Sequence, residues 1–132
     1  MKEDPINDLL TQWEGIYKKG LLTFWMLLLL GQREVYAYEM RQAIEEMSQG
    51  TITADDNSLY RALRRFADSG LVRSEIQPSE IGPPRRYFRL TESGERLLSA
   101  FIQRNIMIFQ SPQVRAAIGN IYGNGQLTNG GE

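Results

Sequence analysis

Arginine is the residue type in this sequence whose number and spacing suggest a chemistry. The 132 residues include 15 basic side chains, of which 12 are arginines, and they contain neither cysteine nor histidine. Without a thiol or an imidazole the chain has no disulfide, no thiolate or imidazole metal ligand and no Ser-His-Asp relay. A planar guanidinium, in contrast, matches phosphate oxygens and the guanine edge. We therefore expect a protein that binds an anionic partner, is not an enzyme, and has no catalytic residue, no cofactor and no metal site.

The arginines are concentrated in the middle of the chain. Residues 1–56 hold five basic and ten acidic side chains, whereas residues 57–96 hold eight basic and five acidic ones. The formal charge of −1 for the whole chain therefore hides a positive middle segment. A local excess of arginine attracts a polyanion, so the partner is expected to bind here.

A helix is predicted over residues 56–69, and its two faces differ in chemistry. At about 100° per residue, one face gathers the apolar side chains Leu59, Leu63, Phe66 and Ala67. The other face carries Asn57, Arg61, Arg64, Arg65 and Asp68. Three arginines on one exposed face can grip phosphates or pair with guanine, and Asn57 and Ser58 lie where base edges would be. The alternative is an ordinary solvated helix face.

A β-hairpin is predicted directly after this helix. Residues 72–77 and 86–90 alternate in polarity, and the loop between them, 78–84, is too long and too rich in proline for a tight turn, so it should project. Arg85, Arg86 and Arg89 lie at its base. Two basic elements would then flank one surface, which favours duplex binding. Tyr60 and Tyr87 could donate hydroxyls to phosphates or fill the gap between helix and hairpin.

Three helices are expected before the arginine-rich helix. Asp4 as N-cap and Pro5 open an amphipathic helix that ends near Gly20. An apolar helix follows over residues 21–30, and a third begins near Tyr36 and ends at Gly50. Ten residues of helix span about 15 Å, half of the apolar core of a bilayer, so residues 21–30 cannot cross a membrane alone. Because no signal-peptide pattern is present, a cytoplasmic location without membrane contact is expected.

The order of these elements predicts the fold. After the first helix, three helices, a two-stranded hairpin and a further helix form the layout of a winged helix-turn-helix, whose third helix enters the major groove. We expect a mainly α protein with a small β-hairpin (α+β). Its parts are an N-terminal helix (1–20), the winged helix-turn-helix (21–91), a C-terminal dimerisation helix with a short final helix (92–122) and a disordered tail (123–132). The predicted DNA-contacting residues are Asn57, Ser58, Tyr60, Arg61, Arg64, Arg65, Arg85, Arg86 and Tyr87.

Three motifs lie in this part of the chain: SLYRALRRF at 58–66, SGLV at 69–72 and GPPRRYFRLTESG at 82–94. Together they resemble the PadR family of bacterial and archaeal transcriptional regulators, over about residues 20–105. The resemblance implies a dimeric winged-helix DNA-binding protein, usually a repressor. Two positions depart from the family pattern: YAYE stands at 36–39 in place of His-Gly-Tyr-Glu, and Asp56-Asn57 replaces Pro-Gly. The sequence is also similar to the compact cyanobacterial clock regulators called period extenders (Pex).

An apolar surplus indicates self-association. The helix expected over residues 92–110 ends in four consecutive apolar residues, 106–109, which a single neighbouring element cannot cover. The predicted dimerisation residues are Trp13, Trp25, Leu98, Phe101, Ile102, Ile108 and Phe109. In a homodimer, two recognition helices related by a two-fold axis would read an inverted repeat in double-stranded DNA.

Two other interpretations stay open. The winged helix could be a protein-interaction module that does not bind DNA, with the acidic first half and the apolar helices as docking surfaces. Some members of the resembled family bind aromatic compounds between subunits, and Trp13, Trp25, Phe101 and Phe109 could bind a small aromatic effector. The simpler interpretation of these four aromatic residues is that they belong to the core.

Overall fold

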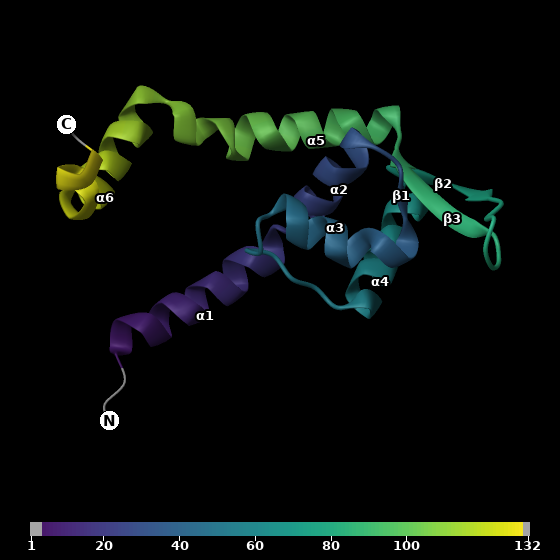
Figure 1. Ribbon diagram of the computed structural model, residues 1–132. Coiled ribbons are helices and arrows are strands. Elements are labelled where there is room, and N and C mark those ends of the chain that lie inside the picture. The colour runs from purple at the N-terminus through teal and green to yellow at the C-terminus, as the bar shows by residue number, and fades with distance from the viewer. Residues whose placement is uncertain (1–3, 131–132) are drawn as a thin grey trace. The chain divides into compact units, whose positions relative to one another are not determined.

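The computed structural model describes the backbone of residues 4–130 and the side chains of residues 4–123. Its elements are, in chain order, α1 (Pro5–Gly20), α2 (Leu22–Gln32), β1 (Val35–Tyr36), the 3-10 helix η1 (Ala37–Glu39), α3 (Met40–Met47), α4 (Asp56–Asp68), β2 (Val72–Gln77), β3 (Arg85–Leu90), α5 (Glu92–Asn105), the 3-10 helix η2 (Met107–Gln110) and α6 (Pro112–Gly130) (Figure 1). This mainly α chain with a small antiparallel sheet confirms the predicted fold class. The chain divides into two compact units after Arg96, and each unit is described by itself.

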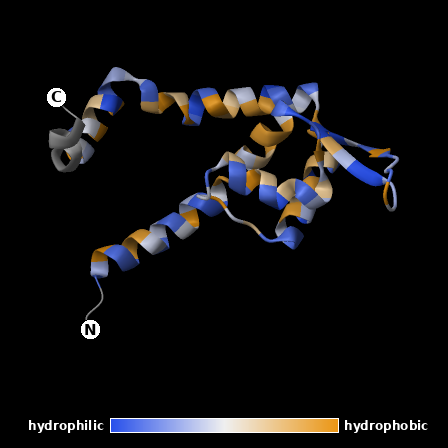
Figure 2. Cartoon of the chain, in the orientation of Figure 1, coloured by the Kyte–Doolittle hydropathy of each residue, from blue (hydrophilic) through white to orange (hydrophobic). Residues whose placement is uncertain are grey.

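α1 begins as its sequence predicts. The backbone N–H of Ile6 donates a hydrogen bond of 3.0 Å to the side chain of Asp4, and Pro5 occupies the first turn, where no intrahelical N–H is required. None of its residues is buried, and its large apolar side chains stay exposed: Ile6, Leu9, Leu10, Trp13, Ile16 and Tyr17. Figure 2 shows apolar residues recurring along this helix. α1 therefore has an apolar face that the rest of its own unit does not cover.

The core of the first unit lies between α2, α3, α4 and the sheet. α2 contributes Met26, Leu27, Leu29 and Leu30, α3 contributes Met40, Ala43 and Ile44, and α4 contributes Leu59, Ala62, Leu63 and Phe66. Val35, Val72 and Phe88 add buried side chains from the three strands. The high apolar content of α2 is thus explained by burial, and no helix in the described part of the chain is both long and apolar enough to cross a membrane.

The sheet has three strands in the order β1-β3-β2, both pairs antiparallel. The predicted hairpin is confirmed: β2 pairs with β3 from Val72↔Leu90 to Gln77↔Arg85, so residues 78–84 form the loop. The third strand was not predicted. β1 has only two residues, too few for a periodic pattern, and it exists because Val35 and Tyr36 pair with Phe88 and Tyr87, some fifty positions later in the sequence.

This strand also corrects the predicted start of the third helix. Tyr36 belongs to β1 and the next three residues form η1, so α3 begins at Met40 and not near Tyr36. After α3, the chain turns at Gln49 and Gly50, whose φ angles are 55° and 82°. The buried Ser48 holds the turn, because its Oγ accepts a 3.0 Å hydrogen bond from the backbone N–H of Ile52. The loop then leads to the start of α4.

Thr91 joins the turn after α4 to the start of α5. Its hydroxyl donates to the carbonyl of Gly70 at 2.7 Å and accepts from the backbone N–H of Gly94 at 3.1 Å, so Thr91 caps α5. Gly94 lies against the backbone, since a Cβ placed there would collide with the carbonyl oxygen of Leu71. The Thr-Glu-Ser-Gly sequence therefore fixes where α5 leaves the sheet.

The second unit differs from the sequence prediction at two places. The helix expected over residues 92–110 ends at Asn105, and Met107–Gln110 form η2. Pro112 is the first residue of α6. α6 continues to Gly130, whereas the sequence predicted a helix to 122 and a disordered tail from 123. No proline follows Pro112, so every later N–H can donate within a helix. Residues 131–132 lie outside the described residues.

Candidate nucleic-acid interface

α4 begins at a capped turn with two acidic residues. The backbone N–H of Ser58 donates a 2.7 Å hydrogen bond to Asp55 Oδ1, and this bond is the main reason that the pKa of the Asp55 carboxyl lies below its usual 3.8. Asp56 Oδ1 lies 3.3 Å from Nε of Arg41 on α3. Both carboxylates are therefore engaged with partners of their own unit, which reduces the repulsion expected between Asp56 and an approaching phosphate.

The polar face of α4 is open to solvent. Asn57, Arg61, Arg64 and Arg65 are exposed, and Leu59, Leu63 and Phe66 are buried, as predicted. One position is corrected: Ala62 is buried, whereas Ala67, expected in the core, is exposed and lines a groove. No carboxylate in the described part of the chain lies within ion-pair distance of Arg61, Arg64 or Arg65. Their guanidinium groups are available to an anionic partner.

A groove of about 620 Å³ separates α4 from the hairpin. α4 lines it with Tyr60, Leu63, Arg64 and Ala67, the segment 36–38 lines it with Tyr36, Ala37 and Tyr38, and the hairpin lines it with Ser74, Pro83, Pro84, Arg86 and Phe88. We call this the interface groove. Its two cationic side chains, Arg64 and Arg86, come from the two elements that the sequence predicted would flank one surface.

The arginines of the hairpin are held in different ways. Arg86 Nη1 donates a 2.8 Å hydrogen bond to the hydroxyl of Ser74 on β2, which orients its side chain in the interface groove. The Arg85 guanidinium lies 4.7 Å from the centre of the Tyr36 ring, a cation–π contact. Arg89 and Tyr87 line a separate hollow with Arg73 and Glu75. The structure thus brings Arg86 into the groove with Arg64, and it does not bring Tyr87 there.

Four tyrosine rings form a continuous series from α4 to β3. Tyr60 contacts Tyr38 with ring centres 6.0 Å apart, Tyr38 contacts Tyr36 at 5.5 Å, and Tyr36 contacts Tyr87 at 5.7 Å. The rings therefore connect α4 to the hairpin through the short segment between α2 and α3. Burial is the main reason that the pKa of Tyr60 is raised above 10.0, so its hydroxyl remains a protonated donor at neutral pH.

Sequence reasoning missed Tyr36 and Tyr38 as members of this groove. It placed Tyr36 at the start of the third helix and gave Tyr38 no role. The only signal at these positions was the departure from the family pattern at residues 36–39, whose consequence depends on β1 pairing with β3.

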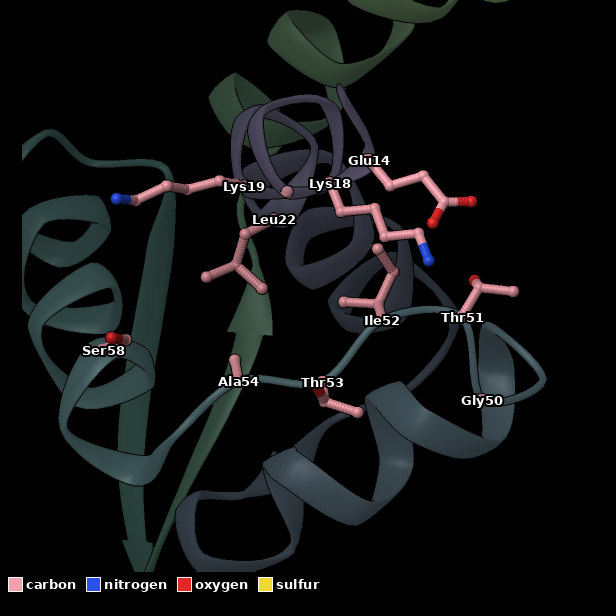
Figure 3. A pocket seen from close by; sticks show the side chains of 11 residues that line it. Glu14, Lys18, Lys19, Leu22, Gly50, Thr51, Ile52, Thr53, Ala54 and Ser58 are labelled. Atoms are coloured by element: carbon pink, nitrogen blue, oxygen red, sulfur yellow. The ribbon is translucent and has the colours of Figure 1, made fainter. Parts of the chain in front are cut away.

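Ser58 lies beside a different hollow, of about 510 Å³, between α1 and the loop that precedes α4 (Figure 3). Lys18 and Lys19 from the last turn of α1 line it, together with Thr51, Thr53 and the acidic Glu14. Ser58 is half-buried, and its backbone N–H donates to the N-cap residue Asp55. The structure does not place Ser58 with Arg64 in the interface groove.

The predicted dimerisation residues differ in exposure. Trp13 is 71% exposed, and Ile108 and Phe109 are each 48% exposed. Leu98 is buried, and Phe101 and Ile102 are half-buried. Trp25 is half-buried and packs edge-on against Phe24, with ring centres 5.4 Å apart. Exposed apolar side chains thus occur in both units, on α1 and on η2.

The chain matches the model of a known protein family, the transcriptional regulator PadR-like family. The match covers residues 26–100, which run from α2 through the interface groove into α5. The chain belongs to the PadR-like family. This confirms the resemblance drawn from the three motifs, all of which lie inside the matched range. The narrower similarity to the period extenders stays a prediction.

Solved structures of transcriptional regulators agree with this placement. A transcriptional regulator from Streptococcus is 35% identical, with 65% of this chain and 82% of that chain covered and a TM-score of 0.55. A PadR-like regulator from Bacillus cereus is 27% identical over 79% of this chain and 93% of its own, with a TM-score of 0.61. PadR of Bacillus subtilis, solved with operator DNA, has the same fold at 21% identity, covering 62% of this chain and 46% of its own, with a TM-score of 0.57.

Proposed function

We propose that this PadR-like regulator is a homodimeric repressor that binds an inverted-repeat operator, with α4 in the major groove and the hairpin loop on the flanking backbone. The observation that carries the proposal is the interface groove, in which Arg64 of α4 and Arg86 of β3 line one surface. The structure of Bacillus subtilis PadR with operator DNA supports this use of the fold. The protein would act in the cytoplasm, where the DNA is.

The chemistry of the groove suits a duplex. A guanidinium can bind a phosphate or the O6 and N7 atoms of guanine, and the unpaired arginines of α4 project from one helix face. Asn57 precedes them on the first turn, where a recognition helix approaches base edges. Arg86 on β3 adds a second positive element next to the helix, as a wing requires.

Dimerisation would account for the exposed apolar side chains. The apolar face of α1 and the η2 residues Ile108 and Phe109 are exposed, and such side chains gain about 25 cal/mol for each Å² that a partner removes from water. A two-fold axis would then place two copies of α4 one helical turn of DNA apart, about 34 Å.

The test is a selection from random duplex DNA followed by titrations of the enriched duplex at several salt concentrations. We expect an inverted repeat, and we expect Arg64→Ala to weaken binding at least about tenfold, because a bidentate arginine contact contributes about 1–3 kcal/mol. If Arg64 neutralises a phosphate, the magnitude of the salt slope also falls by about 0.9 for each phosphate that the variant no longer neutralises.

Arg115→Ala, which removes an exposed arginine from α6, is the matched control and should leave affinity near the wild-type value. Unchanged binding by Arg64→Ala, with the same thermal stability as the wild type, would show that α4 is not the recognition helix. Repression itself is tested by a reporter gene placed behind the selected operator.

The exposed apolar face of α1 favours a second candidate, a protein-interaction module that does not bind DNA. In that case the purified chain would be monomeric by mass measurement and would enrich no duplex. A small aromatic effector is a separate prediction: tryptophan fluorescence that is unaffected by a panel of phenolic compounds would remove it for that panel.

A further inference from the structure

We propose that Tyr38 contacts DNA, donating a hydrogen bond from its phenolic hydroxyl to a backbone phosphate at the edge of the interface groove. The inference rests on the proposed DNA binding and adds a neutral donor to the cationic residues already assigned.

The backbone that presents Tyr38 is held in place. It belongs to η1, and the backbone N–H of Tyr36 donates a 2.9 Å hydrogen bond to Glu39 Oε2 across this turn. Arg33 Nη1 lies 3.5 Å from the same carboxylate oxygen. In addition, Tyr36 is paired with Tyr87 in the sheet. Tyr38 therefore projects from a turn that the sheet and Glu39 fix on both sides.

The Tyr38 ring is ordered by its neighbours although it is exposed. It meets Tyr36 edge-on, with an interplanar angle of 88°, and Tyr60 at 70°. These contacts leave the residue 74% exposed. An aromatic side chain has only two rotatable bonds, and the contacts with two neighbouring rings limit the conformations that Tyr38 adopts. Binding through Tyr38 would consequently cost little side-chain entropy.

The surroundings of Tyr38 select a phosphate as the acceptor. Tyr38 lines the interface groove with Arg64 and Arg86, whose charges attract the DNA backbone. Its hydroxyl has no hydrogen-bond partner among the described residues, so no bond within the protein must be broken first. Tyrosine hydroxyls are among the groups that bind DNA phosphates.

A neutral donor can be distinguished from a cation by salt dependence. Tyr38→Phe keeps the ring contacts and removes only the hydroxyl, so the fold should be retained. We expect the variant to bind the selected operator about tenfold more weakly, because hydrogen bonds to charged groups are among the stronger ones. The slope of log K against log salt should not change, since no counterion release depends on an uncharged group.

The experiment measures wild type, Tyr38→Phe and the control Tyr122→Phe, an exposed tyrosine of α6, by fluorescence anisotropy on the selected operator. A methylphosphonate is then placed at each backbone position in turn. At the phosphate that Tyr38 contacts, the wild type should lose affinity and Tyr38→Phe should lose less. Tyr122→Phe should behave as the wild type throughout.

Three results would overturn the inference. The first is wild-type affinity for Tyr38→Phe, and the second is weaker binding with no backbone position at which the hydroxyl and the phosphate are coupled. The third is a wild-type protein that binds no duplex, in which case the proposed function fails together with the role of Tyr38. If Arg64→Ala weakens binding in the same assay while Tyr38→Phe does not, only the role of Tyr38 fails.

Discussion

At the scale of single residues, Asp55 and Asp56 place two negative charges at the start of α4, the helix proposed to bind a polyanion. Asp55 uses its carboxylate to cap the helix, and Asp56 pairs with Arg41, so neither charge is left without a favourable interaction. The departure from the family pattern at Asp56-Asn57 is therefore compatible with a recognition helix. Where the family pattern has Pro-Gly, this chain begins α4 with a side-chain cap from Asp55, which orients the first turn of the helix.

The cap gives a pH-dependent contribution to stability. The pKa of Asp55 is lower in the folded chain than its usual 3.8, so the folded state binds fewer protons than the unfolded state at this residue. Its stabilising effect is complete above the unfolded pKa and is lost as pH falls through the folded pKa. We expect Asp55→Ala to melt at a lower temperature than the wild type at neutral pH, with a difference that shrinks as the pH falls below the usual pKa of 3.8.

Asp55→Asn is the control for this prediction, because an asparagine still caps a helix but does not titrate. Its melting temperature should be near the wild-type value at neutral pH. An Asp55→Ala deficit of the same size at every pH would mean that protonation of Asp55 does not weaken the cap.

At the scale of elements, the hairpin and α5 are positioned by contacts that leave little space. Thr91 bonds the carbonyl of Gly70 and the N–H of Gly94, while Gly94 lies against the carbonyl of Leu71 and the side chain of Leu90. A shift of α5 would therefore move the end of β3. Arg86 lies on the same strand, four residues before that end, so the position of α5 bears on the interface groove.

Gly94→Ala tests this close approach. Alanine is better than glycine in a helix by about 1 kcal/mol, but overpacking against backbone atoms costs about 1–3 kcal/mol, so the collision should dominate. We expect a lower free energy of unfolding in denaturant titrations. Gly15→Ala in α1, where an added Cβ has nothing within 4 Å, should be neutral or stabilising. Equal effects of the two substitutions would contradict the importance of the contact.

At the scale of the whole molecule, the proposed homodimer gives the exposed apolar face of α1 a partner. Trp13 is 71% exposed on the apolar face of α1, and a lone large apolar face is costly in water. We expect Trp13→Lys to raise the dimer dissociation constant at least about tenfold, because it replaces buried aromatic area with an unpaired charge at an interface. Sedimentation or mass photometry at several protein concentrations measures it.

Thr11→Lys adds the same charge to the opposite side of α1 and is the matched control. It should leave the dissociation constant unchanged. If both variants dimerise as the wild type does, α1 lies outside the dimer interface and the apolar face has another occupant.

The local parts of this protein follow from the sequence alone. The caps at Asp4, Asp55 and Thr91, the buried α2 and the arginine face of α4 depend on residues at most four positions apart, and periodicity reports such relations directly. The predicted β-hairpin also belongs here, because a single loop joins its two strands.

Only the tertiary structure decided what lies beside that arginine face. β1 forms because Val35 and Tyr36 meet Phe88 and Tyr87 across the sheet, and this pairing turns residues 37–39 into η1 and brings Tyr38 next to Tyr60. The tertiary structure also places Arg86 with Arg64 in the interface groove, whereas Tyr87 lines a different hollow. A two-residue strand has no periodic signal of its own, and its position is set by the free edge of a partner strand far along the chain.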